Sequence, residues 1–141
     1  MQPTCCFCSR QHVADGQQLS APRWDIFCRV VDNYGDIGVC WRLARQLVAE
    51  HGVQVRLWVD NLGALNQINP DADPAQVTQI LQGVRVNRWA QEWHAADVAD
   101  VVIEAFGCQL PDRYLSSMTA RADSPLWINL EYLSAEQWVD S

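Results

Sequence analysis

Residues 24–39 read WDIFCRVVDNYGDIGV, and this stretch decides the fold. Residues 24–31 form an apolar run rich in β-branched and aromatic side chains, which predicts a β-strand. Residues 32–38 interrupt the run with polar residues and glycine, which indicates a tight loop. From Val39 onwards, apolar residues recur at helical spacing. The stretch therefore predicts a strand, a loop and a helix in direct succession.

The predicted loop carries two carboxylates, Asp32 and Asp36, four residues apart. Two glycines, Gly35 and Gly38, are expected to let the backbone turn and approach a ligand closely. The carboxylates are suited to holding a cation, such as a metal ion or a guanidinium, or to general-base catalysis. The alternative is purely structural: Asp36 caps the helix and Asp32 ends the strand. The two acids and their position make this loop the first candidate for chemistry.

Strands and helices alternate through the rest of the chain. The predicted strands are residues 53–59, 84–89, 100–106 and 126–130, and the predicted helices are residues 39–50, 62–68 and 111–121. A partial helix is expected at residues 75–82, and a capping pattern at Ser134 starts a further helix. Strand–helix alternation implies a mostly parallel sheet with right-handed crossovers. The predicted fold class is therefore α/β, a Rossmann-like three-layer domain.

The two ends of the chain differ from its middle. Residues 1–23 are rich in Gln, Ser, Thr and Pro without periodicity, and we expect a disordered leader outside the fold. Residues 24–141 then form the folded domain. The helix signalled at Ser134 barely begins before Ser141, so we expect this domain to be truncated.

Composition and charge exclude several classes of function. The 141 residues carry a formal net charge of -7, and all 10 basic side chains are arginines, which argues against binding nucleic acid. No secretory signal and no run of about 20 apolar residues is present, so we expect a cytoplasmic protein without a membrane partner. The spacing of Cys5, Cys6 and Cys8 is wrong for zinc, and no metal site is expected. The other cysteines are interpreted as small buried hydrophobes.

Ligands of open parallel sheets bind outside the carboxyl ends of the strands. Residues 32–38, 107–109 and 131–132 follow three predicted strands, so their loops are expected to share one crevice. The G-x-G-x-x-G fingerprint of dinucleotide sites is absent, and a P-loop is excluded because the chain has no lysine. His94 and Cys108 have no identifiable catalytic partner and are interpreted as structural.

The chain resembles the protein-arginine rhamnosyltransferases that modify elongation factor P in bacteria, the EarP family. The stretches that carry the resemblance are the opening stretch and residues 41–47, 55–60, 105–111 and 129–136. The resemblance runs from Trp24 to the end of the chain. It implies the amino-terminal lobe of a GT-B glycosyltransferase, in which two Rossmann-like lobes face each other across a cleft. Such an enzyme transfers L-rhamnose from dTDP-β-L-rhamnose to an arginine side chain of elongation factor P. The resemblance also implies inversion of the anomeric centre without a metal or other cofactor.

In that family the amino lobe recognises the protein acceptor, and the carboxyl lobe binds most of the nucleotide sugar. The resemblance places the essential aspartates on Asp32 and Asp36, and the substrate-binding positions on Asn33, Tyr34, Gly35 and Gly38. It favours Asp36 as the base for a guanidinium whose pKa exceeds about 12, with Asp32 orienting that group. Because the donor lobe is absent, we expect the chain alone to be inactive. The alternative function is an inactive lobe that serves only as a protein-binding module.

Overall fold

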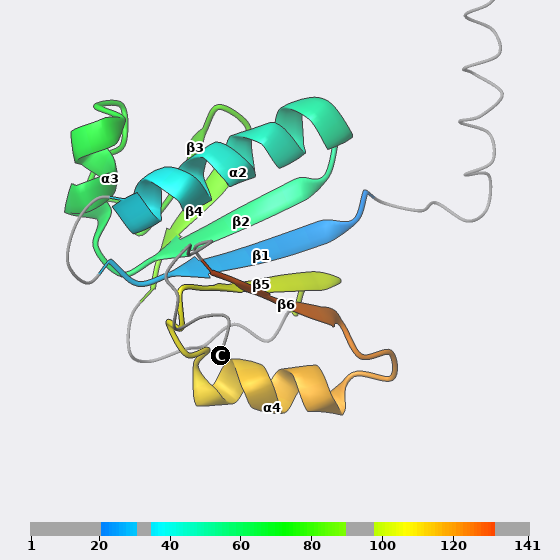
Figure 1. Ribbon diagram of the computed structural model, residues 1–141. Helices are drawn as coiled ribbons and strands as arrows, with labels where there is room; N and C mark the ends of the chain where they lie inside the picture. The colour runs from blue at the N-terminus through cyan, green and yellow to red at the C-terminus, as the bar shows by residue number, and fades with distance from the viewer. Residues whose placement is uncertain (1–20, 31–34, 90–97, 132–141) are drawn as a thin grey trace, which may run out of the picture.

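The computed structural model describes residues 21–30, 35–89 and 98–131. The described elements form a sheet flanked by helices (Figure 1). In chain order they are β1 (Arg23–Cys28), α2 (Gly35–His51), β2 (Gln54–Val59), α3 (Leu62–Ile68), β3 (Thr78–Leu81), β4 (Val84–Arg88), β5 (Val101–Ala105), α4 (Asp112–Ala120) and β6 (Leu126–Leu130). Six of these nine elements agree with the sequence prediction to within one residue at each end: β2, α3, β4, β5, α4 and β6.

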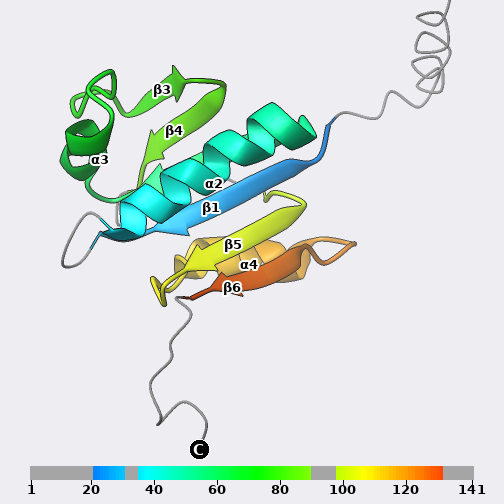
Figure 2. The same cartoon turned by 45° about the horizontal axis from the view of Figure 1, so that its top comes forward.

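The strands lie in the order β3-β4-β2-β1-β5-β6, and every neighbouring pair is parallel except β3 and β4. Figure 2 shows the arrowheads of β1, β5 and β6 at one edge of the sheet, which is the carboxyl edge of the parallel strands. From β1 the chain builds outward through β2 to β4, and it then adds β5 and β6 on the other side of β1. The strand order therefore reverses between β1 and β5, the place where open α/β sheets bind ligands. The predicted mostly parallel, Rossmann-like sheet is confirmed.

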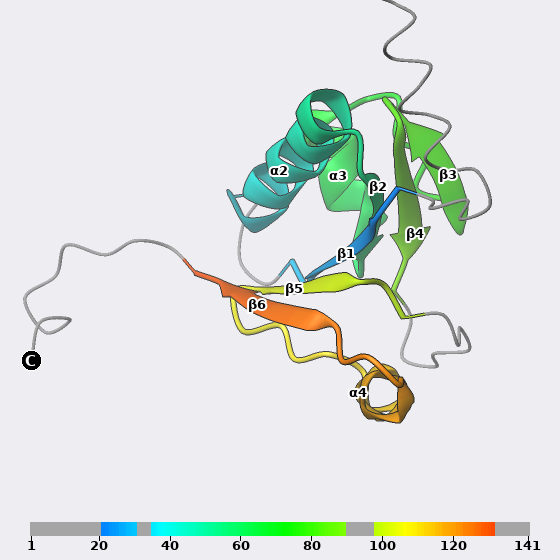
Figure 3. The ribbon, with the colours of Figure 1, turned by 90° about the vertical axis from the view of Figure 1, so that its right-hand side faces the viewer.

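Helices cover both faces of the sheet: α2 and α3 pack on one face and α4 packs on the other (Figure 3). Ile26 and Leu57 are buried in the core beneath α2 and α3. Phe27, Val102 and Tyr114 are buried in the core beneath α4. Successive side chains of a strand point to opposite faces, so β1 contributes to both cores. This burial on two sides explains why the last three residues of β1, Ile26, Phe27 and Cys28, are consecutive apolar side chains.

One charged side chain lies inside the second core. Asp25 of β1 is fully buried, and its two carboxylate oxygens accept hydrogen bonds from Nε and Nη2 of Arg56 at 2.6 and 2.7 Å. The hydroxyl of Tyr114 on α4 donates to the same carboxylate at 2.6 Å and accepts from the N–H of Ala99 at 3.2 Å. Burial, followed by the negative charge of Asp25, raises the pKa of Tyr114 above its usual range. A buried charge needs such partners, and here they tie α4 and β2 to the centre of the sheet.

The helix that follows β1 begins earlier than predicted. α2 starts at Gly35, so Asp36 and Gly38 lie in its first turns and not in a loop. A carboxylate in the first turn favours a helix because it interacts with the exposed N–H groups and the positive end of the dipole. The far end is as predicted: α2 ends at His51, and the N–H of Gly52 donates to the carbonyl of Val48 at 3.2 Å.

The expectation of a partial helix at residues 75–82 is wrong. Thr78–Leu81 is strand β3, which pairs antiparallel with β4. Gln82 and Gly83 join the two strands with φ of 49° and 83°. Two left-handed residues in succession are the signature of a tight hairpin turn whose twist matches that of the strands. The signal was a Gln-Gly pair between two runs of β-forming residues.

The first strand is shorter than predicted at its carboxyl end. β1 ends at Cys28, and the N–H of Val30 donates to Oδ1 of Asp60 at 2.8 Å instead of to a neighbouring strand. The helix expected at Ser134 and nearly all of the predicted leader lie outside the described residues. Within the described part of the chain, no helix is both long enough and apolar enough to cross a membrane.

Candidate functional site

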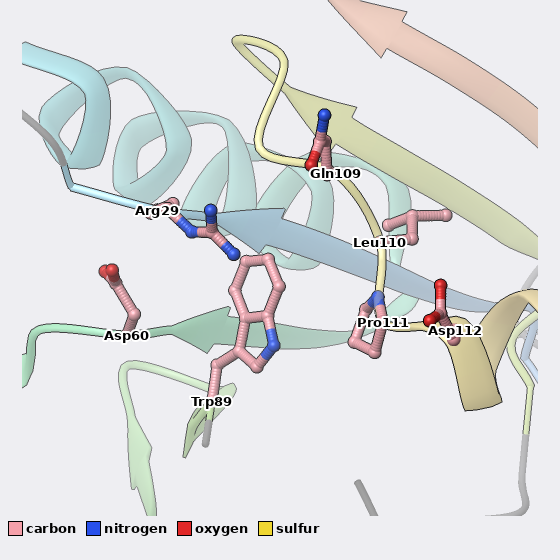
Figure 4. A pocket seen from close by; sticks show the side chains of 7 residues that line it. All are labelled: Arg29, Asp60, Trp89, Gln109, Leu110, Pro111 and Asp112. Carbon is pink, nitrogen blue, oxygen red and sulfur yellow. The ribbon is translucent and has the colours of Figure 1, made fainter. Parts of the chain in front are cut away.

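A pocket of about 440 Å³ lies at the carboxyl edge of the sheet (Figure 4). Its walls come from segments that follow β1, β2, β4 and β5, so the strand order brings together residues far apart in the sequence. The lining residues are Arg29, Asp60, Trp89, Gln109, Leu110, Pro111 and Asp112. The position agrees with the rule that ligands bind at the switch point of such sheets.

On the side of the pocket formed after β1, β2 and β4, the indole ring of Trp89 forms the wall. Trp89 is buried, its backbone N–H donates to the carbonyl of Val59 at 2.8 Å, and its ring packs edge-on against Phe27. The guanidinium of Arg29 lies over the face of Trp89, with Cζ 5.2 Å from the ring centroid. A cation at this distance is attracted by the ring quadrupole. Asp60 completes this side, fixed by its hydrogen bond from the N–H of Val30.

The opposite wall is the turn between β5 and α4, whose backbone is strained. Phe106, Gly107 and Gln109 have φ of 54°, 66° and 65°. Two of the three are not glycine, and a side chain in this left-handed region meets its own backbone. The N–H of Gln109 donates to Oε2 of Glu104 at 2.9 Å, and the thiol of Cys108 donates to the carbonyl of Phe27 at 3.4 Å. The first bond ties the strained turn to β5, and the second ties it to β1.

The predicted site residues divide into two groups. Asp32, Asn33 and Tyr34 lie outside the described residues. Gly35, Asp36 and Gly38 all belong to α2. Asp36 is half-buried in the first turn, at the carboxyl end of the connection from β1.

The two glycines do not form the turn that the sequence predicted, because both are helical. An added Cβ at Gly38 would meet no heavy atom within 4 Å. Packing within the described residues therefore gives no reason for glycine at this position. Among the described residues, nothing fills the space that this Cβ would enter at the amino end of α2.

The crevice expected between residues 32–38, 107–109 and 131–132 stays a prediction, because among their described members Gln109 lines this pocket, and residues 32–34 lie outside the described part of the chain. Residues 107–109 do lie beside the segment that leaves β1, since Gln109 and Arg29 line one pocket. Glu131 is exposed and is not a lining residue, and residue 132 is outside the described part of the chain. The sequence reading missed Arg29, Asp60, Trp89 and Asp112, although each stands at the end of a strand or the start of a helix.

The surroundings of Cys28 and Cys108 disfavour the thiolate, which is the nucleophilic form of cysteine. Cys28, Cys40 and Cys108 are free and buried, as predicted. A hydrogen bond with Cys40, then burial, then the charges of Asp36 and Asp60 raise the pKa of Cys28 far above its usual range. Burial raises the pKa of Cys108 to about 12, so it stays a neutral thiol. Among the described residues, no group of three or more His, Cys, Asp or Glu side chains could hold a metal ion.

Comparison with known proteins gives a consistent result. The family model described as Elongation-Factor P (EF-P) rhamnosyltransferase EarP matches residues 24–141. A protein-arginine rhamnosyltransferase of Pseudomonas putida is 62% identical over 117 residues, which are 83% of this chain and 31% of that protein. A protein of the same name from Pseudomonas aeruginosa is 59% identical over 118 residues, which are 84% of this chain and 31% of that protein. One from Neisseria meningitidis is 49% identical over 115 residues, which are 79% of this chain and 29% of that protein. The chain spans about a third of the length of these curated relatives.

Proposed function

Because this chain belongs to the family of elongation factor P rhamnosyltransferases, we propose that it is the acceptor-facing lobe of a protein-arginine rhamnosyltransferase. The proposed enzyme transfers L-rhamnose from dTDP-β-L-rhamnose to an arginine of translation elongation factor P and inverts the anomeric centre. A second Rossmann-like lobe binds the nucleotide sugar, which completes a GT-B enzyme. The observation that carries the proposal is Asp36 in the first turn of α2, beside the switch point of the sheet, in a region matched by the family.

The proposed chemistry needs a carboxylate at this place. A guanidinium stays protonated at neutral pH and is a poor nucleophile. Asp36 accepts an N–H of the guanidinium in a charge-assisted hydrogen bond, while Asp32 orients the group. The nitrogen then attacks C1 of the rhamnose from the face opposite the diphosphate. The C1–O bond breaks, dTDP leaves with the bonding electrons, and the proton passes to Asp36.

The remaining predicted residues have supporting roles in the proposal. Asn33, Tyr34, Gly35 and Gly38 contact the substrates, and the assignment of Gly38 is supported by the finding that an added Cβ there would meet no heavy atom of the described residues within 4 Å. The reaction as proposed uses no metal ion and no cofactor besides the donor. The free thiols of Cys28 and Cys40 support a reducing compartment, the cytoplasm.

The test joins this chain to the remaining two thirds of the Pseudomonas putida relative and measures rhamnose on elongation factor P by mass spectrometry. Replacing Asp36→Asn is expected to lower the transfer rate by about a hundredfold or more, because the proton acceptor is lost. Asp32→Asn is expected to act in the same direction. Asp123→Asn, which changes an exposed aspartate before β6, is the matched control. Unchanged transfer in both site variants, with folding verified by circular dichroism, contradicts the assignment.

The second candidate is that the 141 residues by themselves, which cover 31% of the length of the Pseudomonas putida relative, act only as a protein-binding module. We expect the isolated 141 residues to transfer no rhamnose, because the proposed reaction needs the second lobe to bind the donor. Incubation of the isolated chain with donor and elongation factor P checks this, and any rhamnosylated product contradicts it.

A further inference from the structure

The proposed reaction at Asp36 assigns no role to the pocket at the carboxyl edge of the sheet. It lies on the α4 side of β1, and its lining includes Arg29, the first residue after that strand. Asp60 accepts a hydrogen bond from the N–H of Val30, two residues after β1, and the next described element after that strand is α2, which carries Asp36 in its first turn. A ligand bound at Asp36 therefore has this pocket as its neighbour.

The chemistry of the lining selects the kind of ligand. One guanidinium, Arg29, stands against two carboxylates, Asp60 and Asp112. Figure 4 shows Arg29 between Asp60 and Gln109. A nucleotide diphosphate is disfavoured because negative side chains outnumber the positive one. A polypeptide segment is favoured, since its amides and side chains of both signs match a mixed lining with an aromatic wall.

The strained turn gives an independent reason to expect a function here. Backbone strain persists where surrounding bonds enforce it, and it clusters at ligand sites. The N–H of Gln109 is held by Glu104, and that of Cys108 is held by Ala105. The turn therefore offers the carboxamide of Gln109, and not its backbone N–H, to a ligand. A carboxamide both donates and accepts, which suits it to a peptide group.

We infer that this pocket binds a segment of the protein acceptor adjoining the target arginine, and that Gln109 is the side chain that recognises it. The inference rests on the proposed function for the identity of the acceptor. Glu104 acts as a positioning residue, because it fixes the left-handed backbone from which Gln109 projects.

The first experiment titrates elongation factor P into the isotope-labelled 141-residue chain. The indole N–H signal of Trp89, assigned with Trp89→Phe, is expected to shift on binding. Calorimetry is expected to show that Gln109→Ala raises the Kd about tenfold, the loss of one or two hydrogen bonds. Gln109→Ala keeps the Cβ, so the backbone strain is unchanged and folding is preserved.

The matched control is Gln82→Ala. Gln82 is also an exposed glutamine with left-handed φ, but it lies in the β3–β4 hairpin, before β4 and away from the carboxyl edge. Its Kd is expected to stay within about twofold of the native value. For the positioning role, Glu104→Ala is expected to weaken binding and Glu104→Gln to restore most of it, because the amide oxygen still accepts from Gln109. Trp127→Phe removes the other hydrogen bond of Glu104 and is expected to leave the Kd unchanged.

Three outcomes overturn the inference. Equal Kd values for the native chain and Gln109→Ala remove the recognition role while leaving the proposed transfer reaction intact. A Trp89 shift caused by dTDP or dTDP-rhamnose, without elongation factor P, assigns the pocket to the donor. Absence of any binding to elongation factor P excludes the acceptor from this pocket. Failure of the proposed function is separate, since it appears as a lack of transfer by the native two-lobe enzyme.

Discussion

Two turns of this chain place glutamine in the left-handed region, and they differ in what holds them there. In the β3–β4 hairpin, the φ values of Gln82 and Gly83 follow from the twist of the two strands they join. In the β5–α4 turn, Phe106 and Gly107 are enclosed by a backbone bond from the N–H of Cys108 to the carbonyl of Ala105. At Gln109, the N–H donates instead to the side-chain carboxylate of Glu104, and the thiol of Cys108 donates to the carbonyl of Phe27. Strain explained by sheet geometry indicates a structural turn, and strain held by dedicated side chains beside a pocket indicates a site.

The largest expected effect is on the free energy of unfolding when the glycine of each turn is replaced by alanine. Gly83 has φ +83°, and an added Cβ would lie 2.9 Å from Cγ1 of Val48, whereas Gly107 has φ +66° and open space. Gly83→Ala is expected to lower the free energy of unfolding by about 2 kcal/mol or more, and Gly107→Ala by about 1 kcal/mol. Urea unfolding measures both. The excess at Gly83 is expected to shrink in a Val48→Ala background, and equal losses would contradict the contact.

Replacing each left-handed glutamine by glycine is expected to stabilise the chain, and it also tests whether the two turns differ in binding. Gln109→Gly and Gln82→Gly are each expected to raise the free energy of unfolding by up to about 1 kcal/mol, because the Cβ strain is relieved. Only Gln109→Gly is expected to weaken binding to elongation factor P. Thermal unfolding and calorimetry on the same samples separate the two effects. A loss of binding in Gln82→Gly as well would show that the turns do not differ in function.

Gly38 in α2 is a third glycine whose replacement separates an effect on stability from an effect on function. Gly38→Ala is expected to stabilise the chain by roughly 0.5–1 kcal/mol, because alanine is the better helix former and meets nothing. In the two-lobe enzyme the same change is expected to raise the KM for a substrate, since the methyl group enters the space assigned to it. Unfolding curves and initial rates check the two parts. Lower stability would contradict the open space, and unchanged kinetics would remove Gly38 from the proposed site.

The smallest effect is expected at Asp100, which immediately precedes β5. The N–H of Arg23 donates to its carboxylate at 3.0 Å, and this bond, aided by Arg121, lowers the pKa of Asp100 below its usual value. A carboxyl group with a lowered pKa in the folded state stabilises the fold above its unfolded pKa near 4, and the contribution is lost as the pH falls through the folded pKa. Asp100→Asn is expected to remove less than about 1 kcal/mol near neutral pH, because the group is half exposed.

Stability measured between about pH 6 and pH 2 checks this prediction. The native chain and Asp100→Asn are expected to converge as the pH falls. If the difference in unfolding free energy between the two chains grew as the pH fell, the lowered pKa of Asp100 would be contradicted. Transfer by the two-lobe enzyme is expected to be unaffected, which contrasts Asp100 with the groups at the carboxyl edge.

The sequence by itself determined the elements that depend on neighbouring residues. Local pattern predicted a helix at residues 62–68 and strands at residues 53–59 and 126–130, which are α3, β2 (Gln54–Val59) and β6, and Gly52 predicted the end of α2. Alternation of these elements was enough to predict a mostly parallel α/β sheet. Local pattern succeeds here because helix and strand periods are set by residues within one or two turns of each other.

Only the tertiary structure decided which distant residues meet. Asp25 looks like an ordinary strand residue until the register of β1 with β2 places Arg56 beside it and α4 brings Tyr114 to the same carboxylate. Arg29 and Gln109 share a pocket because β5 lies next to β1, although 80 positions separate them in the sequence. Strand order and register are set by burial over the whole sheet, so no local pattern contains them. Asp36 was readable from the sequence as a candidate residue, and the pocket at the carboxyl edge was not.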